Sequence, residues 1–308
     1  MNRWLIGARP RTLPAAVVPV AIGAACALDV PRGRGWWPES WRSDPIIVIG
    51  DDFGPVWWRV AMALIVSLAL QVGVNYANDY SDGVRGTDDV RVGPARLVAG
   101  GLAPATSVRR AAFTAFGVAA VAGFTVVLAT SPWLLVVGVA AIAAGWFYTG
   151  GSRPYGYSGL GELFVFVFFG LVATVGTTYV AVETITWLSI LMGCAVGGLA
   201  CALLVINNLR DIPTDREVGK RTLAVRLGDR RTRWLYAALL GSAFILVVVA
   251  ALDRTWVLLA LAAVPLAVTP TRTVLNGAAG PELIGVLGDT GRLQLAFGLL
   301  ATVGMAIG

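Results

Sequence analysis

Two short acidic stretches are the part of this sequence best suited to chemistry. Each closes a long apolar run with the spacing Asn-x-x-x-Asp: Asn78 with Asp82, then Asn207 with Asp211, which is followed by Asp215. Residues four apart lie on one face of a helix, so each stretch presents its side-chain oxygens together. Carboxylates are costly beside hydrocarbon, so acids in this repeated pattern favour a functional site over simple caps of the helix ends.

The chemistry of these side chains favours Mg²⁺ and a diphosphate. The sequence has no histidine, which excludes histidine-ligated haem, histidine-based zinc sites and a histidine general base. Oxygen ligands without histidine or cysteine favour Mg²⁺, which proteins usually hold together with phosphate oxygens. Basic residues near the acids suit the same polyanion: these are Arg85, Arg91, Arg210, Lys220 and Arg221.

The elements that position these acids are expected to be membrane helices. Of the 308 residues, 57% are hydrophobic and only 14% are charged, and the mean hydropathy is +0.74. Soluble domains carry far more charge. We therefore predict an all-α polytopic membrane protein with nine transmembrane helices around a central cavity. The predicted spans are 12–29, 57–79, 108–129, 132–148, 159–181, 186–208, 233–252, 255–271 and 291–307.

The basic residues predict the orientation of these spans. With the N-terminus in the cytoplasm, most of the 24 Lys and Arg residues fall on the cytoplasmic side, as the positive-inside rule requires. Both acidic stretches then lie on that side, so the cavity should open to the cytoplasm. The net charge of +6 is explained by topology, and we predict membrane lipid rather than nucleic acid as a partner.

A third segment, residues 148–162, is rich in glycine and is expected to be a tight cytoplasmic loop between two spans. It leads into a run that contains Phe164, Phe166, Phe168 and Phe169. These rings either line a groove for a lipid tail or serve as packing and lipid-facing surface, and the sequence leaves both readings open.

Several of these segments resemble the UbiA superfamily of intramembrane prenyltransferases. The resemblance runs from Ala-Arg-Pro-Arg-Thr-Leu-Pro at 8–14, through the loop at 148–162, to the second acidic stretch and Gly-Lys-Arg-Thr-Leu at 219–223. The usual first motif of the family is Asn-Asp-x-x-Asp-x-x-x-Asp. This chain has Gly86 in place of the last Asp, with Asp88 two residues later, and that departure resembles the branch acting on 1,4-dihydroxy-2-naphthoate in menaquinone synthesis.

The resemblance implies one domain, residues 1–308, at the cell membrane. It implies Mg²⁺-dependent transfer of a prenyl group from polyprenyl diphosphate to 1,4-dihydroxy-2-naphthoate, with loss of CO₂. The metal ligands would be Asn78, Asp82, Asp88, Asp211 and Asp215. The substrate-binding residues would be Arg9, Arg11, Arg91, Arg210, Lys220, Asn78 and Asn207. Lys220 and Arg91 would neutralise the leaving diphosphate, Asp79, Tyr148 or a phosphate oxygen would accept a proton, and Arg9 or Arg11 would meet the acceptor's carboxylate.

Two alternatives remain at this stage. A relative with another acceptor is one, the acceptor being 4-hydroxybenzoate, a haem precursor or a sugar phosphate. A cation-coupled transporter is the other, but transporters place acids near the membrane midplane, whereas these acids lie at the ends of spans.

Overall fold

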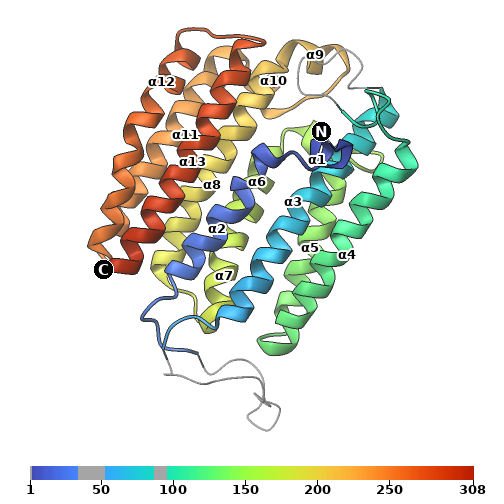
Figure 1. Ribbon diagram of the computed structural model, residues 1–308. Helices are drawn as coiled ribbons and strands as arrows, with labels where there is room; N and C mark the ends of the chain where they lie inside the picture. Colours follow the sequence, from blue (N-terminus) through green and yellow to red (C-terminus); the bar gives the residue numbers. More distant parts are fainter. Residues whose placement is uncertain (1, 34–52, 87–95) are drawn as a thin grey trace.

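The fold is a bundle of helices in a computed structural model that describes residues 2–33, 53–86 and 96–308 (Figure 1). Within these ranges the named elements are all helical. They are α1 (Arg3–Ala8), η1 (Pro10–Thr12), α2 (Pro14–Ala25), α3 (Trp57–Arg85), α4 (Ala105–Ala129), α5 (Trp133–Phe147), η3 (Tyr155–Ser158), α6 (Gly161–Val165), η4 (Phe166–Val172), α7 (Ala173–Val182), α8 (Trp187–Arg210), α9 (Ile212–Glu217), α10 (Leu223–Leu227), α11 (Asp229–Ala250), η5 (Thr255–Ala263), α12 (Val264–Leu275) and α13 (Glu282–Ile307).

The long helices make this a multi-pass membrane protein. In the described part of the chain, seven helical stretches are long and apolar enough to cross a membrane. Two shorter apolar helices, α2 and α5, occupy the other two positions at which the sequence predicts spans. The prediction of an all-α membrane fold is therefore confirmed.

The last two predicted spans differ from the structure at their ends. The span expected at 255–271 continues to Leu275, and the last helix begins at Glu282 rather than at 291. Pro265 does not interrupt the first of these stretches, because it lies in the opening turn of α12, where a missing N–H leaves no helical hydrogen bond unmade. The connection between them turns at Gly277 and Gly280, both with positive φ.

Helix α8 lies at the centre of the bundle and is the most buried of the seven long helical stretches. The π-helical segment η4 crosses it at glycines: a Cβ on Gly170 would lie 2.5 Å from the Cα of Gly197. A π-segment shifts the register of the side chains that follow it, and such segments are frequent at functional sites. Here the surrounding run directs Phe164, Phe168 and Phe169 into a cavity.

The acidic stretches lie at the same end of the bundle. Figure 1 shows the N-terminus, α9 and α10 toward that end and the C-terminus at the opposite end. This agrees with the predicted placement of both stretches on one side of the membrane, because Lys220, which follows α9, contacts Asp82 near the end of α3.

Candidate active site

One large cavity brings the two acidic stretches together. Its volume is about 1850 Å³, and residues from α3, α8 and α9 line its polar end. Ten of the site residues proposed from the sequence line it: Arg9, Arg11, Asn78, Asp82, Tyr148, Asn207, Arg210, Asp211, Asp215 and Lys220. Two others, Asp88 and Arg91, lie outside the described residues.

Tyr157 and Lys220 connect the first acidic stretch to the second. The hydroxyl of Tyr157 donates a hydrogen bond to Oδ1 of Asp82, and Nζ of Lys220 lies 3.5 Å from the same oxygen. The ammonium also lies 4.5 Å from the centre of the Tyr157 ring, a favourable cation–π position. Since Lys220 and Asp82 are 138 residues apart in sequence, these contacts assemble one site from both halves of the chain.

The turn after α9 returns Lys220 toward the acids. Gly219 has a φ of +75°, a conformation that L side chains rarely adopt, and the backbone N–H of Lys220 donates to the carbonyl of Asp215 at 2.8 Å. At the start of this segment the guanidinium of Arg210 donates to both carboxylate oxygens of Asp211, at 2.7 and 2.8 Å. Hydrogen bonds between charged groups therefore fix the positions of Lys220 and Arg210 relative to the aspartates of the site.

The loop at 148–160 covers the end of α3. The hydroxyl of Thr149 donates to Oδ1 of Asn78 at 2.8 Å. Arg85 donates to the carbonyls of Thr149 and Gly151, and its guanidinium lies 5.5 Å from the centre of the Tyr157 ring. Neither Thr149 nor Tyr157 is recognisable as a site residue from the sequence, where the one signal is a glycine-rich loop expected on the same side as the acids.

The oxygen atoms of this site fit Mg²⁺. The carboxylates of Asp82, Asp211 and Asp215 and the amides of Asn78 and Asn207 line its polar end, and the sequence supplies no histidine. Among the residues that the structure describes, no three acidic, histidine or cysteine side chains are close enough to form a closed metal cage. Mg²⁺ suits such an open set, because it commonly binds one or two carboxylates and takes its other ligands from phosphate and water.

Asp79 does not reach the cavity, in contrast to the role expected for it. Its carboxylate is 1% exposed and accepts hydrogen bonds from the backbone N–H groups of Leu97 and Val98, at 2.9 and 3.0 Å. An α-helix turns by roughly 100° per residue, so the side chain of Asp79 leaves α3 in a different direction from that of Asn78. The Asp79 carboxylate therefore holds the 97–100 turn against α3.

Tyr148 lies in the loop that follows α5, at the wall of the cavity. Burial raises the pKa of its phenol well above the ordinary value, and the nearby Glu162, Tyr155, Asp82 and Asp215 raise this pKa further. The phenol therefore stays protonated at neutral pH. It is better suited to donate a hydrogen bond than to accept a proton as a phenolate.

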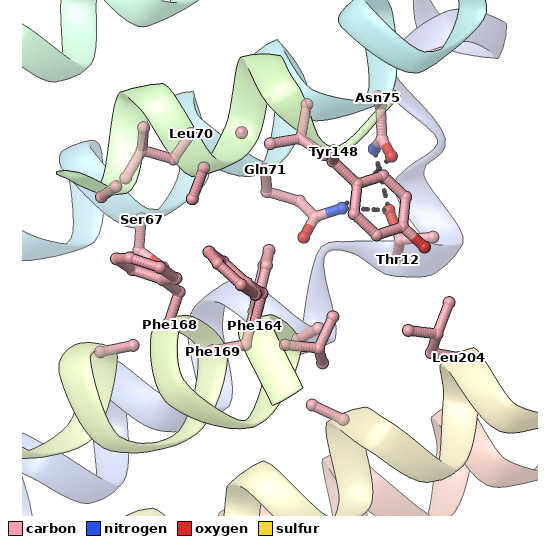
Figure 2. Close-up of a pocket in the computed structure, with 18 of the residues that line it drawn as sticks. Thr12, Ser67, Leu70, Gln71, Asn75, Tyr148, Phe164, Phe168, Phe169 and Leu204 are labelled. Atoms are coloured by element: carbon pink, nitrogen blue, oxygen red, sulfur yellow. Dashed lines mark hydrogen bonds between the residues drawn. The ribbon is translucent and has the colours of Figure 1, made fainter. Parts of the chain in front are cut away.

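The remainder of the cavity is apolar. Tyr148, Tyr155 and Phe164 follow one another along one wall, with ring centres 5.5 and 4.0 Å apart, and Phe168 lies beyond them. Figure 2 shows Phe164, Phe168 and Phe169 on one side of the pocket and Ser67, Gln71 and Asn75 of α3 on the other. Of the four phenylalanines in this run, Phe166 alone is absent from the lining, and it packs against Gly197 instead.

The apolar end of the cavity reaches the outside of the bundle. Its lining there comes from α4 and α5 and includes Val121, Phe124, Leu135 and Val139. Each of these side chains is at least half exposed. The cavity thus joins a charged end to an apolar end that is accessible from the side.

Comparison with known proteins identifies the family. The sequence matches the UbiA prenyltransferase family over residues 46–280. The chain belongs to this family. Among its relatives, the 1,4-dihydroxy-2-naphthoate octaprenyltransferase of Mycobacterium tuberculosis is 48% identical, with 99% of this chain and 97% of that protein covered. The protein of the same description from Escherichia coli is 36% identical, with 89% and 85% covered.

Solved structures of UbiA homologs share the fold. The apo homolog from Aeropyrum pernix K1 superposes with a TM-score of 0.65 at 13% identity, covering 96% of this chain and 97% of that chain. A homolog from Archaeoglobus fulgidus, bound to GPP and Mg²⁺, superposes with a TM-score of 0.64 at 14% identity, covering 99% and 100%. The UbiA fold therefore extends over nearly the whole chain.

Proposed function

We propose that this UbiA-family chain transfers a polyprenyl group from a polyprenyl diphosphate to 1,4-dihydroxy-2-naphthoate, with loss of CO₂, in menaquinone biosynthesis. The observation that carries the proposal is one cavity that joins the two acidic stretches and Lys220 to a long apolar wall. Near-full-length relatives described as 1,4-dihydroxy-2-naphthoate octaprenyltransferases support the choice of acceptor.

The charged end of the cavity would bind the diphosphate. Asn78, Asp82, Asp211 and Asp215 would hold Mg²⁺, and we retain Asp88 as a further ligand. When bound, the metal supplies positive charge that favours departure of the diphosphate. Lys220, 3.5 Å from Asp82, is positioned to neutralise the charge that develops on the leaving group.

The remaining basic and amide groups would complete substrate binding. Arg210 and Asn207 line the same end of the cavity, and we keep Arg91 as a further partner of the diphosphate. The apolar wall beyond Phe164, at Phe168 and Phe169, would receive the prenyl tail. Loss of the diphosphate leaves an allylic cation, which the electron-rich ring of the acceptor then attacks.

Arg9 is the residue best suited to the acceptor's carboxylate. It lines the cavity, and its Nη2 is a buried atom to which the described residues offer no hydrogen-bond partner. A buried guanidinium nitrogen without a partner is costly unless a ligand satisfies it. Arg11 lines the cavity nearby and would add to the positive potential.

The orientation and architecture follow from the same proposal. We propose nine spans, with α2 and α5 as the two short ones, in a single domain of residues 1–308. The N-terminus and the charged end of the cavity would face the cytoplasm, because most basic residues then lie on that side.

The test is turnover by the purified protein in detergent. It receives a polyprenyl diphosphate and 1,4-dihydroxy-2-naphthoate, with either Mg²⁺ or EDTA. Mass spectrometry should detect a decarboxylated, prenylated naphthoquinol only with Mg²⁺. Prenylation of another acceptor instead would overturn the acceptor assignment. Failure to bind any prenyl diphosphate would overturn the assignment as a prenyltransferase.

A further inference from the structure

A polar strip on α3 faces the aromatic wall of the cavity. Ser67, Gln71 and Asn75 are four residues apart along the helix and therefore share one face. Phe164 and Phe168 lie opposite (Figure 2). This pocket combines a flat apolar wall with fixed polar atoms, as recognition of a flat aromatic ring with polar substituents requires.

The hydrogen bonds of this strip fix the orientation of both amide groups. Nδ2 of Asn75 donates to the carbonyl of Ala8 at 2.9 Å, and a carbonyl can only accept, so Oδ1 of Asn75 must point the other way. The hydroxyl of Thr12 donates to the carbonyl of Arg9 at 2.9 Å, so it can only accept from its other neighbours.

Gln71 meets both of these acceptors with its amide nitrogen. Nε2 of Gln71 lies 3.0 Å from the hydroxyl oxygen of Thr12 and 3.3 Å from Oδ1 of Asn75. Its oxygen, Oε1, is thereby turned away from the network and toward the open centre of the pocket (Figure 2). No described residue donates a hydrogen bond to this oxygen, although the Gln71 residue is only 6% exposed.

A buried amide oxygen that points into a pocket favours ligands that donate a hydrogen bond to it. The same network holds Arg9 nearby, since Thr12 donates to the Arg9 carbonyl. A ligand that offers a carboxylate to Arg9 and a hydroxyl to Gln71 would satisfy both groups. A hydroxylated aromatic acid has this combination, whereas the prenyl tail has neither group.

We propose that Gln71 determines acceptor specificity, with its Oε1 accepting a hydrogen bond from a ring hydroxyl of the acceptor while the ring lies against Phe164. This inference rests on the proposed function. A pocket built to hydrogen-bond a hydroxyl discriminates strongly against a ligand without it, because the pocket's own polar atom is then left without a partner. Gln71 acts by positioning the ring and takes no part in bond making.

The test compares acceptors that differ by one hydroxyl. Dissociation constants of the full-length protein in detergent are measured by calorimetry, without the prenyl donor, for 1,4-dihydroxy-2-naphthoate, 1-hydroxy-2-naphthoate and 4-hydroxy-2-naphthoate. The wild type should bind the dihydroxy acid about tenfold or more tightly than one of the two monohydroxy acids. In Gln71→Met, which has a similar length but no amide, that ratio should fall to near one.

A control variant separates this role from a structural one. Ser67→Ala removes a hydroxyl from the same face of α3, one turn away from Gln71. That hydroxyl donates to the carbonyl of Ala16, so the binding ratio should stay at the wild-type value. The Michaelis constant for the prenyl diphosphate should be unchanged in both Gln71→Met and Ser67→Ala.

Three results would overturn the inference. They are equal binding of all three acids by the wild type, an unchanged ratio in Gln71→Met, and an equal loss of the ratio in Ser67→Ala. Turnover by the wild type keeps the two proposals apart. If the wild type prenylates 1,4-dihydroxy-2-naphthoate, these results concern Gln71 alone; if it does not, the proposed function fails and takes this inference with it.

Discussion

Replacing Tyr157 by phenylalanine tests whether the link between the two acidic stretches matters for function. The change removes the hydrogen bond to Asp82 and leaves the ring beneath Lys220. Both charged partners are largely buried, with side-chain exposures of 12% for Lys220 and 7% for Asp82, so solvent replaces the lost bond poorly. Hydrogen bonds to charged groups contribute about 1.5–3 kcal/mol, which corresponds to a roughly 10- to 150-fold loss in kcat/KM for the diphosphate.

The assay measures Mg²⁺-dependent prenyl transfer by purified protein over a range of donor and metal concentrations. Tyr157→Phe should raise the metal concentration needed for half-maximal rate, because groups that hydrogen-bond a metal ligand tune the affinity of the site. Tyr157→Leu, which also removes the cation–π contact with Lys220, should lose roughly a further 2- to 30-fold. Wild-type kinetics in the phenylalanine variant would refute the reasoning, as would a leucine variant no worse than the phenylalanine one. Thermal unfolding checks that both variants remain folded.

The other predictions concern the acids, the arginines, one helix crossing and one phenol. Asp82→Asn and Asp211→Asn should each nearly abolish turnover without reducing membrane insertion, and a near-wild-type rate in either would remove that residue from the metal site. Arg91→Ala should raise KM for the diphosphate more than KM for the acceptor, and Arg9→Ala should do the reverse; equal effects on both constants would indicate a structural role. Gly170→Leu should lower the free energy of unfolding by about 3 kcal/mol or more, because its Cβ would lie 2.5 Å from the Cα of Gly197, whereas Gly117→Leu has open space and should be nearly neutral in thermal unfolding. The raised pKa of Tyr148 means that its phenol is neutral at pH 6–9, so Tyr148→Phe should keep the shape of the pH–rate profile there. Above roughly pH 10 the Tyr148 phenol ionises in the unfolded chain but stays protonated in the folded protein. The free energy of unfolding of the wild type should therefore fall as pH rises, and it should fall less steeply in Tyr148→Phe.

The membrane fold was predictable because membrane thickness sets the length of an apolar helix. Long apolar runs such as 57–79 and 186–208 correspond directly to α3 and α8. The last spans were less accurate, since hydropathy does not mark where Glu282 begins a helix ahead of the apolar run. Pro265 does not end the span predicted at 255–271 early, because the first turn of α12 accommodates it.

The acids of the site were predictable from spacing, but their partners were not. Helical periodicity placed Asn78 and Asp82 on one face, and the structure confirms that both line the cavity. The resemblance suggested Asp79 as a proton acceptor, although its carboxylate binds the 97–98 backbone instead. Loop residues such as Tyr157 have no periodicity, so only the folded chain shows which of them approaches Asp82.

The side opening of the cavity has a consequence for how this protein would meet its substrates. An apolar end that reaches the outer surface of α4 and α5 faces lipid in a membrane-embedded bundle. A donor with a long tail would therefore arrive by diffusion within the plane of the bilayer. Its effective concentration is then the number of donor molecules per unit of membrane area. Adding inert lipid at a fixed total amount of donor should slow the reaction, whereas changing the volume of water at fixed concentrations of acceptor and Mg²⁺ should not.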